Sequence, residues 1–421
     1  MEKEKEIVAW VGLDWADQQH EICLQKVGEE SVQCLTLKHQ PEALHQWVQE
    51  LRRRFGQGRV AVAMEQFRGG LIHALMGYEF LVLYRVPPNM VAKYREAFRS
   101  SGAKDDPSDA AFLLELVRLH SERLRAWTPG DVLTRTLQRL VEYRRHTVNE
   151  GTALRNELTS FLKGYFPQAL RWAGSLKSAQ ALDFLARWPS LPVLQKARAY
   201  QIRQFYQRHG SRAVLEERLQ EIRQAQPLTE DPAVVMTSVM RVQGLIEQLR
   251  CVMKALKRWD EKIAELFEQH RDHELYENLP GAGPALAPRL LAAFGSDRSR
   301  YQSAQELQQF SGIAPVTEAS GKSHWVHWRW ACPKFLRQSF HEFAGHSIAR
   351  SSWARAYYYQ QREKGNRHHA AVRALAYKWI RILFRCWQEG VPYQEEIYLR
   401  ALERRQSPLW IRMTQQVAAV A

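Results

Sequence analysis

Residues 7–14, IVAWVGLD, form a short apolar run that ends in an aspartate, and residues 59–65, RVAVAME, form a second run that ends in a glutamate. Short apolar runs bounded by polar residues predict buried strands. If these two strands lie side by side, Asp14 and Glu65 project from the same edge of one sheet. Active sites are often built where several strand ends meet in this way.

The surrounding segments complete an α/β pattern. Residues 21–27 and 32–37 alternate apolar and polar side chains, as half-buried antiparallel strands do, and residues 80–86 predict a further strand. Helical periodicity is present in three segments, residues 41–55, 69–78 and 110–120. This order of strands and helices predicts an RNase H-like α/β domain, which we place at residues 1–126.

The rest of the chain has the pattern of helices. A long amphipathic helix pattern covers residues 133–161, and charged heptad-like stretches follow at residues 214–225 and 236–270. They predict an antiparallel helical hairpin or coiled coil within a helical region at 127–275. This region is interpreted either as a spacer or as a dimerisation arm that also touches nucleic acid. Residues 276–400 predict a mainly α domain, and residues 401–421 a short, poorly ordered tail.

Composition limits the partners of the protein. The chain has 421 residues, 45% of them hydrophobic, and a net charge of +15. The basic charge points to nucleic acid first and to an anionic membrane surface second. Residues 271–421 hold 21 Lys and Arg against 12 Asp and Glu, a surplus of nine. No apolar stretch approaches about 20 residues, and the charged N-terminus is unlike a signal peptide. We therefore expect no membrane partner and a cytoplasmic, nucleoid-associated protein.

The five cysteines show neither a CxxC pair nor zinc-site spacing. We expect reduced thiols in all of them: Cys23, Cys34, Cys251, Cys332 and Cys386.

Four acids predict a metal site: Asp14, Glu65, Asp106 and Asp109. Asp106 and Asp109 are three residues apart at the start of a helix and therefore share one face. Taken singly, each acid also fits an ordinary role as an N-cap, a first-turn acid or a solvated strand end. Together they supply the converging carboxylate oxygens that two hard cations need, so Mg²⁺ is expected, with Mn²⁺ possible.

The segment LPGAGPALAPRLLAAFG at residues 279–295 resembles a helix-hairpin-helix element. Gly281 and Gly283 allow a tight turn, and the helix that follows offers free backbone N–H groups to a phosphate. An ordinary packing unit of two helices is the alternative interpretation.

A serine in a basic neighbourhood follows at residues 318–323, EASGKS. A serine before glycine in a loop is sterically open to act as a nucleophile, although a plain turn is the commoner meaning of this pattern. On chemistry alone, Ser311 and Ser323 are rivals of Ser320. Tryptophans alternate with His and Arg at residues 325–330, a pattern that fits core packing or strand pairing better than base stacking. The cations expected to contact phosphates are Lys322, Arg329, Lys334 and Arg337.

Several blocks of the sequence resemble one family, the DEDD insertion-sequence transposases that a bridge RNA guides. The N-terminal blocks are GLDWADQQHEICL (12–24), VAMEQFRGGLIHAL (62–75) and AKDDPSDAAFLLEL (103–116). The C-terminal blocks are LPGAGP (279–284), LLAAFGS (290–296), SAQELQQFSGIAP (303–315), EASGKS (318–323), LRQSF (336–340), KGN (364–366) and AVRALAYKWIRILF (371–384). The inter-domain pieces 166–172 and 181–197 are also similar, so the resemblance covers residues 1–400.

The resemblance implies a RuvC-like N-terminal domain with Asp14, Glu65, Asp106 and Asp109 as metal ligands. It also implies a C-terminal transposase domain in which Ser320 attacks a DNA phosphodiester and forms a covalent phosphoserine link. The serine domain of one subunit would complete the DEDD site of another in a dimer or tetramer. A structured noncoding bridge RNA would pair with donor and target DNA.

The chain departs from the family pattern at three places. Lys104-Asp105-Asp106 stands where Lys-Thr-Asp is usual, Cys332-Pro333 stands where Gly-Asn is common, and tryptophans replace small or basic residues at 325–330. None of these changes removes a proposed catalytic group. A RuvC-like structure-specific endonuclease that uses water as nucleophile is the alternative function, and a non-catalytic nucleic-acid scaffold is a third.

Overall fold

The computed structural model describes residues 6–65, 70–98, 106–210 and 215–418. The chain divides into two compact units, residues 1–130 and 131–421. The predicted boundary at residue 126 falls close to this division, whereas the predicted boundary at 275 falls inside the second unit.

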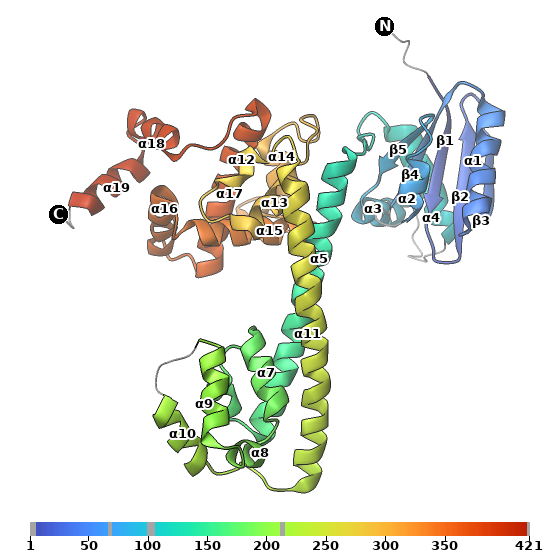
Figure 1. Cartoon of the computed structure of the whole chain (residues 1–421). Coiled ribbons are helices and arrows are strands. Elements are labelled where there is room, and N and C mark those ends of the chain that lie inside the picture. The colour runs from blue at the N-terminus through green and yellow to red at the C-terminus, as the bar shows by residue number, and fades with distance from the viewer. Residues whose placement is uncertain (1–5, 66–69, 99–105, 211–214, 419–421) are drawn as a thin grey trace. The chain divides into compact units, whose positions relative to one another are not determined.

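The first unit is built on one mixed five-stranded sheet (Figure 1). Strand β2 runs antiparallel to both of its neighbours, β1 and β3, whereas β4 and β5 run parallel to the central strand β1. In spatial order the strands are β3 (Val32–Lys38), β2 (Gln19–Lys26), β1 (Ile7–Asp14), β4 (Arg59–Met64) and β5 (Leu81–Arg85). The predicted α/β class of the N-terminal region is therefore confirmed.

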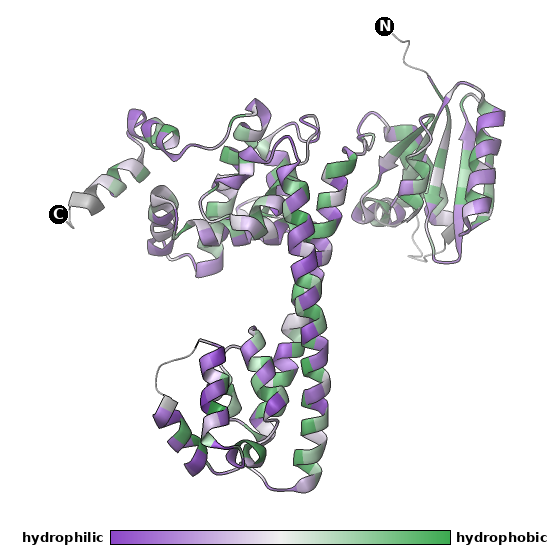
Figure 2. Ribbon diagram, viewed as in Figure 1, coloured by the Kyte–Doolittle hydropathy of each residue, from purple (hydrophilic) through white to green (hydrophobic). Residues whose placement is uncertain are grey.

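Helices bury both faces of this sheet. On one face, Val11 and Leu13 share a core with residues of α1 (Pro41–Phe55) and α2 (Gly70–Leu75). On the other face, Ala61 and Ala63 pack with residues of α3 (Pro88–Phe98) and α4 (Asp106–His120). Figure 2 shows the resulting contrast between the apolar strands and the hydrophilic outer side of α1.

Helix α4 lies directly on β1 because Gly12 has no side chain. A Cβ atom at this position would stand 2.0 Å from the carbonyl oxygen of Ala110 and 2.3 Å from the backbone nitrogen of Leu114. Real Cβ contacts are about 3.5 Å or longer. The residue type at position 12 therefore sets how closely the helix approaches the strand.

Two long antiparallel helices organise the second unit, α5 (Val132–Tyr165) and α11 (Pro232–Glu268) (Figure 1). Their interface includes ion pairs between Arg144 and Asp260 and between Arg241 and Glu157. The heptad-like stretch predicted at 236–270 is thus paired with the amphipathic helix predicted at 133–161, whereas the stretch at 214–225 forms the short helix α10 (Leu215–Gln224).

The paired helices enter two separate hydrophobic cores. The C-terminal end of α5 and the N-terminal half of α11 pack into one core with the short helices that connect them. These are α6 (Ala169–Trp172), α7 (Ala179–Arg187), α8 (Leu191–Gln195), α9 (Ala199–Arg208) and α10 (Leu215–Gln224). The start of α5 and the end of α11 belong to the second core, which we call the C-terminal lobe.

The C-terminal lobe is mainly helical and contains one β-hairpin. Its helices are α12 (Glu274–Glu277), α13 (Gly283–Phe294), α14 (Ala304–Phe310), α15 (Lys334–Ser347), α16 (Ser352–Glu363), α17 (His368–Glu389), α18 (Glu395–Arg404) and α19 (Pro408–Ala418). The hairpin consists of β6 (Val316–Ser320) and β7 (Ser323–His327). No described helix is both long enough and apolar enough to cross a membrane.

The expectation of a poorly ordered tail after residue 400 is wrong. Helices α18 and α19 occupy most of this segment. Leu402 and Leu409 are 8% and 4% exposed and belong to the core of the lobe. Burial of these two side chains ties the charged segment down.

Candidate functional site

Asp14 and Glu65 lie at the carboxyl ends of two adjacent parallel strands. In the register of β1 and β4, Leu13 pairs with Met64, and the two acids are the next residues along each chain. The expectation that they share one edge of the sheet is confirmed.

Asp14 lies on the face of the sheet that α4 covers, and Glu65 lies at the end of the neighbouring strand. Gly12 meets α4 directly, and Asp14 is two residues further along β1, on the same face. Ala63 of β4 packs with α4, and Glu65 follows two residues later, directly after β4 ends at Met64. The strand ends and α4 therefore bring acidic residues toward one region.

Asp109 is the buried acid of α4. Its side chain is 2% exposed and accepts a hydrogen bond of 2.9 Å from Nε of Arg95 and a second from Nη2 of the same residue. A buried carboxylate is stable only with such a partner. Asp106 is the first residue of α4, whereas Lys104 and Asp105 lie outside the described residues.

The chemistry of these acids fits a hard divalent cation. Mg²⁺ and similar ions take oxygen ligands, which Asp14, Glu65 and Asp109 supply. Among the described side chains, no three His, Cys, Asp or Glu are close enough together to hold a metal ion, and Arg95 occupies Asp109. The donor types therefore match a metal site.

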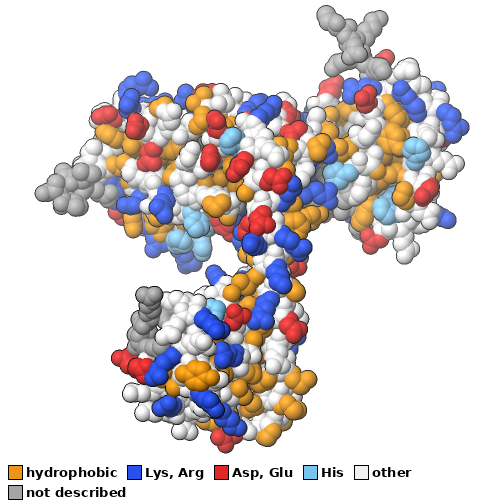
Figure 3. All heavy atoms as spheres, viewed as in Figure 1, with side chains coloured by type: hydrophobic (Ala, Val, Ile, Leu, Met, Phe, Trp, Pro, Cys, Tyr) orange, Lys and Arg blue, Asp and Glu red, His pale blue; other side chains and the backbone are white. Residues whose placement is uncertain are grey.

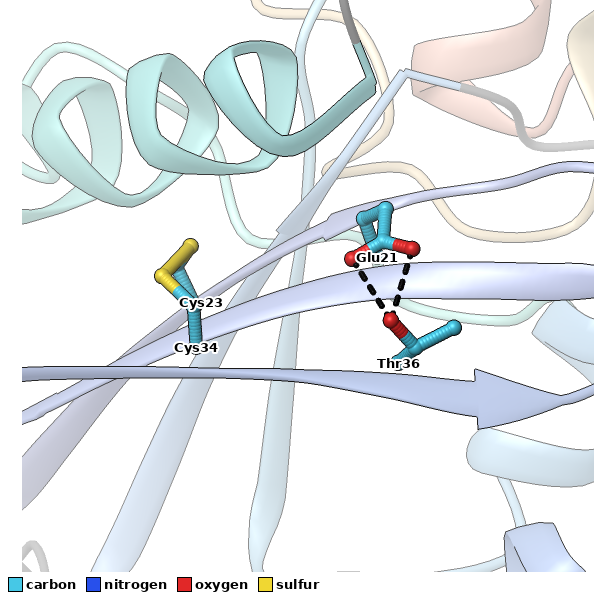
Figure 4. Close-up of a disulfide and its surroundings, with 4 residues drawn as sticks. All are labelled: Glu21, Cys23, Cys34 and Thr36. Atoms are coloured by element: carbon cyan, nitrogen blue, oxygen red, sulfur yellow. Dashed lines mark hydrogen bonds between the residues drawn. A yellow bond between two sulfur atoms is a disulfide. The ribbon is translucent and has the colours of Figure 1, made fainter.

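A fifth acid, Glu21, stands directly opposite Asp14 in the register of β1 and β2. Oγ1 of Thr36, on β3, lies 2.8 and 3.1 Å from its two carboxylate oxygens and donates to them (Figure 4). Sequence reasoning left this acid out, because only the strand register places it beside Asp14.

Two histidines brace the loop that follows Asp14. Nδ1 of His20 accepts a hydrogen bond from the backbone N–H of Ala16 at 3.3 Å, so its Nε2 donates to Nδ1 of His39 at 2.9 Å. Burial lowers the pKa of His20, and His39 lowers it further. The neutral ring thus holds the loop. These histidines are 19 residues apart and form no sequence motif.

Cys23 and Cys34 form a disulfide between directly opposed residues of β2 and β3 (Figure 4). The expectation that all cysteines are reduced is therefore wrong for this pair. Their spacing matches no motif, and the pairing follows from the strand register. The free cysteines are Cys251, Cys332 and Cys386.

Ser320 is an exposed residue at the tip of the β6–β7 hairpin. It pairs with Ser323 across the turn formed by Gly321 and Lys322, where Gly321 has φ +57. Such two-residue turns favour glycine, which adopts positive φ without strain. Its rival Ser311 is fully buried at the end of α14 and donates to the carbonyl of Gln308. Exposure therefore favours Ser320 and Ser323 over Ser311.

The hairpin carries its own cation, His327. Its Nδ1 lies 3.0 Å from the carbonyl oxygen of Trp328, and its Nε2 lies 2.9 Å from Oε1 of Glu318. The hydrogen bond to Glu318 raises the pKa of His327, and the bond to Trp328 adds to this effect. A protonated ring is consistent with both contacts.

The structure brings two of the predicted phosphate-binding cations together. Nη1 of Arg337, on α15, donates to the carbonyl of Arg329 at 3.4 Å. Lys322 is exposed in the hairpin turn, and Lys334 is the exposed first residue of α15.

Gly281 and Gly283 form the predicted tight turn, with φ +85 and +56. A Cβ at Gly281 would come within 2.7 to 2.9 Å of the backbone of His346 and Ser347, so this glycine also lets the turn pack on α15. Phosphate binding by this turn stays a prediction.

Two family models match the chain. A DEDD transposase model of the IS110 type, described as "Transposase", matches residues 11–167. A model described as "Transposase IS116/IS110/IS902 family" matches residues 273–359. The first match contains all four predicted metal ligands, and the second contains Ser320.

Full-length relatives agree with these models. The mini-circle putative transposase for IS117 from Streptomyces coelicolor is 27% identical over 93% of this chain and 97% of its own length. An IS116 protein of 44.8 kDa from Streptomyces clavuligerus is 25% identical over 89% of this chain and 93% of its own. An IS900 protein of 42 kDa from Mycobacterium paratuberculosis is 26% identical over 80% and 84%. The chain therefore belongs to the IS110/IS116/IS902 family of transposases and is an enzyme of DNA transposition.

Proposed function

We propose that this transposase cuts and rejoins DNA through a covalent phosphoserine intermediate on Ser320. The observation that carries the proposal is the position of Ser320. It is exposed at the tip of a β-hairpin, beside Lys322 and close in sequence to the His327 cation. Positive groups near a loop hydroxyl favour approach of a phosphodiester and stabilise the charge that develops during attack.

In the chemical step, Oγ of Ser320 replaces one of the DNA oxygens bonded to phosphorus. Oγ of Ser320 forms a bond to phosphorus while the bond from phosphorus to one DNA oxygen breaks, and the hydroxyl proton passes to a base or to solvent. The DNA end departs with its electron pair and gains a proton. Rejoining reverses the exchange, because a DNA hydroxyl attacks the phosphoserine and Ser320 leaves.

The carboxylates are proposed to serve the same reaction. Asp14, Glu65, Asp106 and Asp109 would hold Mg²⁺ or Mn²⁺, which when bound polarises the phosphate and stabilises the leaving oxygen. For Asp109 this requires exchange of the Arg95 ion pair. The order of the five strands, with β1 central and β4 and β5 parallel to it, supports a RuvC-like domain as the carrier of this site.

The test compares Ser320→Ala with Ser323→Ala, because the two serines face each other across one turn. With labelled DNA and Mg²⁺, denaturing gels should show a protein–DNA adduct for the wild type and for Ser323→Ala. Ser320→Ala should give none, and Asp14→Asn should neither cut DNA nor form the adduct. Normal recombination by Ser320→Ala would refute the serine assignment.

The same gels separate this proposal from hydrolysis. A RuvC-like endonuclease that activates water would cut DNA in a metal-dependent manner and leave no protein attached. Cut products without an adduct, unchanged in Ser320→Ala, would establish that alternative.

The proposed assembly is a dimer or tetramer guided by a bridge RNA, as the family resemblance implies. If the DEDD site and the serine come from different subunits, mixing Asp14→Asn with Ser320→Ala should restore strand transfer in mixed oligomers. RNA guidance predicts that recombination needs the noncoding RNA encoded beside the gene, and that changes in its loops redirect the target. Full activity without RNA would remove this part of the proposal.

A further inference from the structure

One indole ring in the C-terminal lobe lies within cation–π distance of two guanidinium groups. Cζ of Arg373, on α17, is 3.7 Å from the ring centroid of Trp328, and Cζ of Arg337, on α15, is 4.7 Å from it. Cations within about 6 Å of an aromatic face are attracted to it. Trp328 follows the hairpin directly, so this contact fastens the base of the hairpin to both helices.

The positive charge at this ring is not balanced by a neighbouring acid. Within the described part of the chain, neither Arg337 nor Arg373 is in an ion pair, and the buried Nε of Arg373 has no hydrogen-bond partner. Burial lowers the pKa of Arg373, and the charge of Arg337 lowers it further. Two like charges held together with an unused buried donor indicate a site for an anion.

The surrounding sequence extends this positive field. Residues 319–341 and 364–388 contain no Asp or Glu. The rings of His341 and His369 lie with their centroids 5.5 Å apart and their planes tilted by 38°. The pKa of His341 is lowered by burial first, then by His369 and Arg373. Figure 3 shows His side chains grouped beside Lys and Arg on the visible face of the C-terminal lobe.

Two tryptophans beside this site face solvent. Trp325 is 60% exposed and Trp330 is 77% exposed, so the core-packing interpretation is wrong for both. The strand-pairing interpretation is confirmed for Trp325, which lies in β7 opposite Glu318. The Trp325 ring contacts the ring of His327, with centroids 4.4 Å apart and planes tilted by 32°. Large exposed aromatics next to unbalanced cations are typical of surfaces that bind unpaired nucleic acid.

We infer that this surface binds an unpaired DNA strand, with Arg337 and Arg373 on its phosphates and Trp325 and Trp330 stacked on its bases. The inference rests on the proposed function, since the strand nearest Ser320 would be DNA. Unpaired bases are required because in a duplex their faces are already stacked. Arg373 lies beyond the region matched by the C-terminal family model, which ends at residue 359.

The test measures binding without chemistry. Fluorescence anisotropy in EDTA would follow the full-length protein with labelled single-stranded DNA, the matching duplex and single-stranded RNA of the same sequence. The variants are Arg373→Gln, Arg337→Gln, Trp330→Ala and Trp330→Phe. Arg385→Gln is the matched control, because this exposed arginine of the same helix is already paired with Glu389.

We expect Trp330→Ala to weaken binding of single-stranded DNA about tenfold, while Trp330→Phe keeps most of it. Each arginine variant should lower the slope of log affinity against log salt by about 0.7, the value for one phosphate contact of a single strand. Arg385→Gln should bind like the wild type. Thermal unfolding checks that each variant is folded. If Arg373→Gln is not folded, the variants of the exposed residue Trp330 decide the test.

Three results would overturn the inference: unchanged binding by Trp330→Ala and Arg337→Gln, equal losses for duplex and single strand, or losses confined to RNA. Repeating the assay with Ser320→Ala keeps the two proposals apart. If that variant binds normally and still forms the covalent adduct, the serine assignment fails while the binding surface stands.

Discussion

Replacing Gly12 with alanine should separate α4 from the five-stranded sheet. The added Cβ would lie 2.0 Å from the carbonyl oxygen of Ala110, where about 3.5 Å is needed, so the helix must retreat by about 1.5 Å. Neither obstructing atom belongs to a flexible side chain, because both are backbone atoms of α4. The displacement would carry Asp109 away from the ends of β1 and β4.

Two magnitudes follow from this displacement. Overpacking of a core costs about 1–3 kcal/mol, and rigid backbone obstruction puts Gly12→Ala at the upper end of that range. A misplacement of about 1 Å in a catalytic group lowers a rate by about 100-fold. The rate of DNA strand breakage by Gly12→Ala should therefore fall by at least about 100-fold. The amides of α4 and β1 should also lose protection from hydrogen exchange.

The matched controls are Gly164→Ala and Gly244→Ala, two helical positions where a new Cβ meets nothing within 4 Å. These changes should leave strand breakage unchanged and stabilise their helices by up to about 1 kcal/mol. If Gly12→Ala keeps the wild-type rate and exchange pattern, the close approach of α4 to β1 does not position the acids, and the reasoning is refuted.

Three other perturbations test the same structure. Arg95→Ala leaves the buried Asp109 without its partner and should destabilise the protein by about 3–5 kcal/mol in EDTA. Added Mg²⁺ should reduce the stability difference between wild type and variant in thermal unfolding, and an unchanged difference would argue against metal binding by Asp109. Burial raises the pKa of Asp131 but hydrogen bonds from Ser296 and Thr134 outweigh it and lower the pKa from 3.8 to about 2, so its contribution is present above pH 4 and lost as the pH falls toward 2; with screening at this exposed side chain, Asp131→Asn should cost about 1 kcal/mol at pH 7 and nothing at pH 2 by urea unfolding. Reduction of the Cys23–Cys34 disulfide, which closes a short loop, should destabilise the first unit by about 3 kcal/mol. A Cys23→Ser/Cys34→Ser double variant should have the same stability with and without reductant.

Sequence patterns predicted those helices and strands whose packing requires a regular spacing of apolar residues. The apolar runs before Asp14 and Glu65 became adjacent strands, and the helical patterns at 133–161 and 236–270 became α5 and α11. In each case the burial of one face or of a whole strand leaves its period in the residues. The family resemblance then gave roles to single residues that periodicity cannot assign.

Features set by register or by turn chemistry escaped the sequence. Helix α3 was not predicted from the sequence; it begins at Pro88, where the missing N–H of proline is harmless. Gly321-Lys322 is a hairpin turn inside a region expected to be mainly helical. The pairing of Cys23 with Cys34 depends on which residues of two strands stand opposite. These outcomes depend on partners distant in sequence or on backbone angles.

The pair of α5 and α11 fixes a spacing between two cores. Along α5, Val141 belongs to the core of the C-terminal lobe and Leu158 to the core of the far helices. At 1.5 Å per residue these positions are about 25 Å apart. Removing seven residues from both helices would keep the packing face in register and bring the cores about 10 Å closer. The paired helices α5 and α11 therefore set the distance between the two cores. Insertions or deletions of seven residues in both helices would change this distance and leave the packing of each core unchanged.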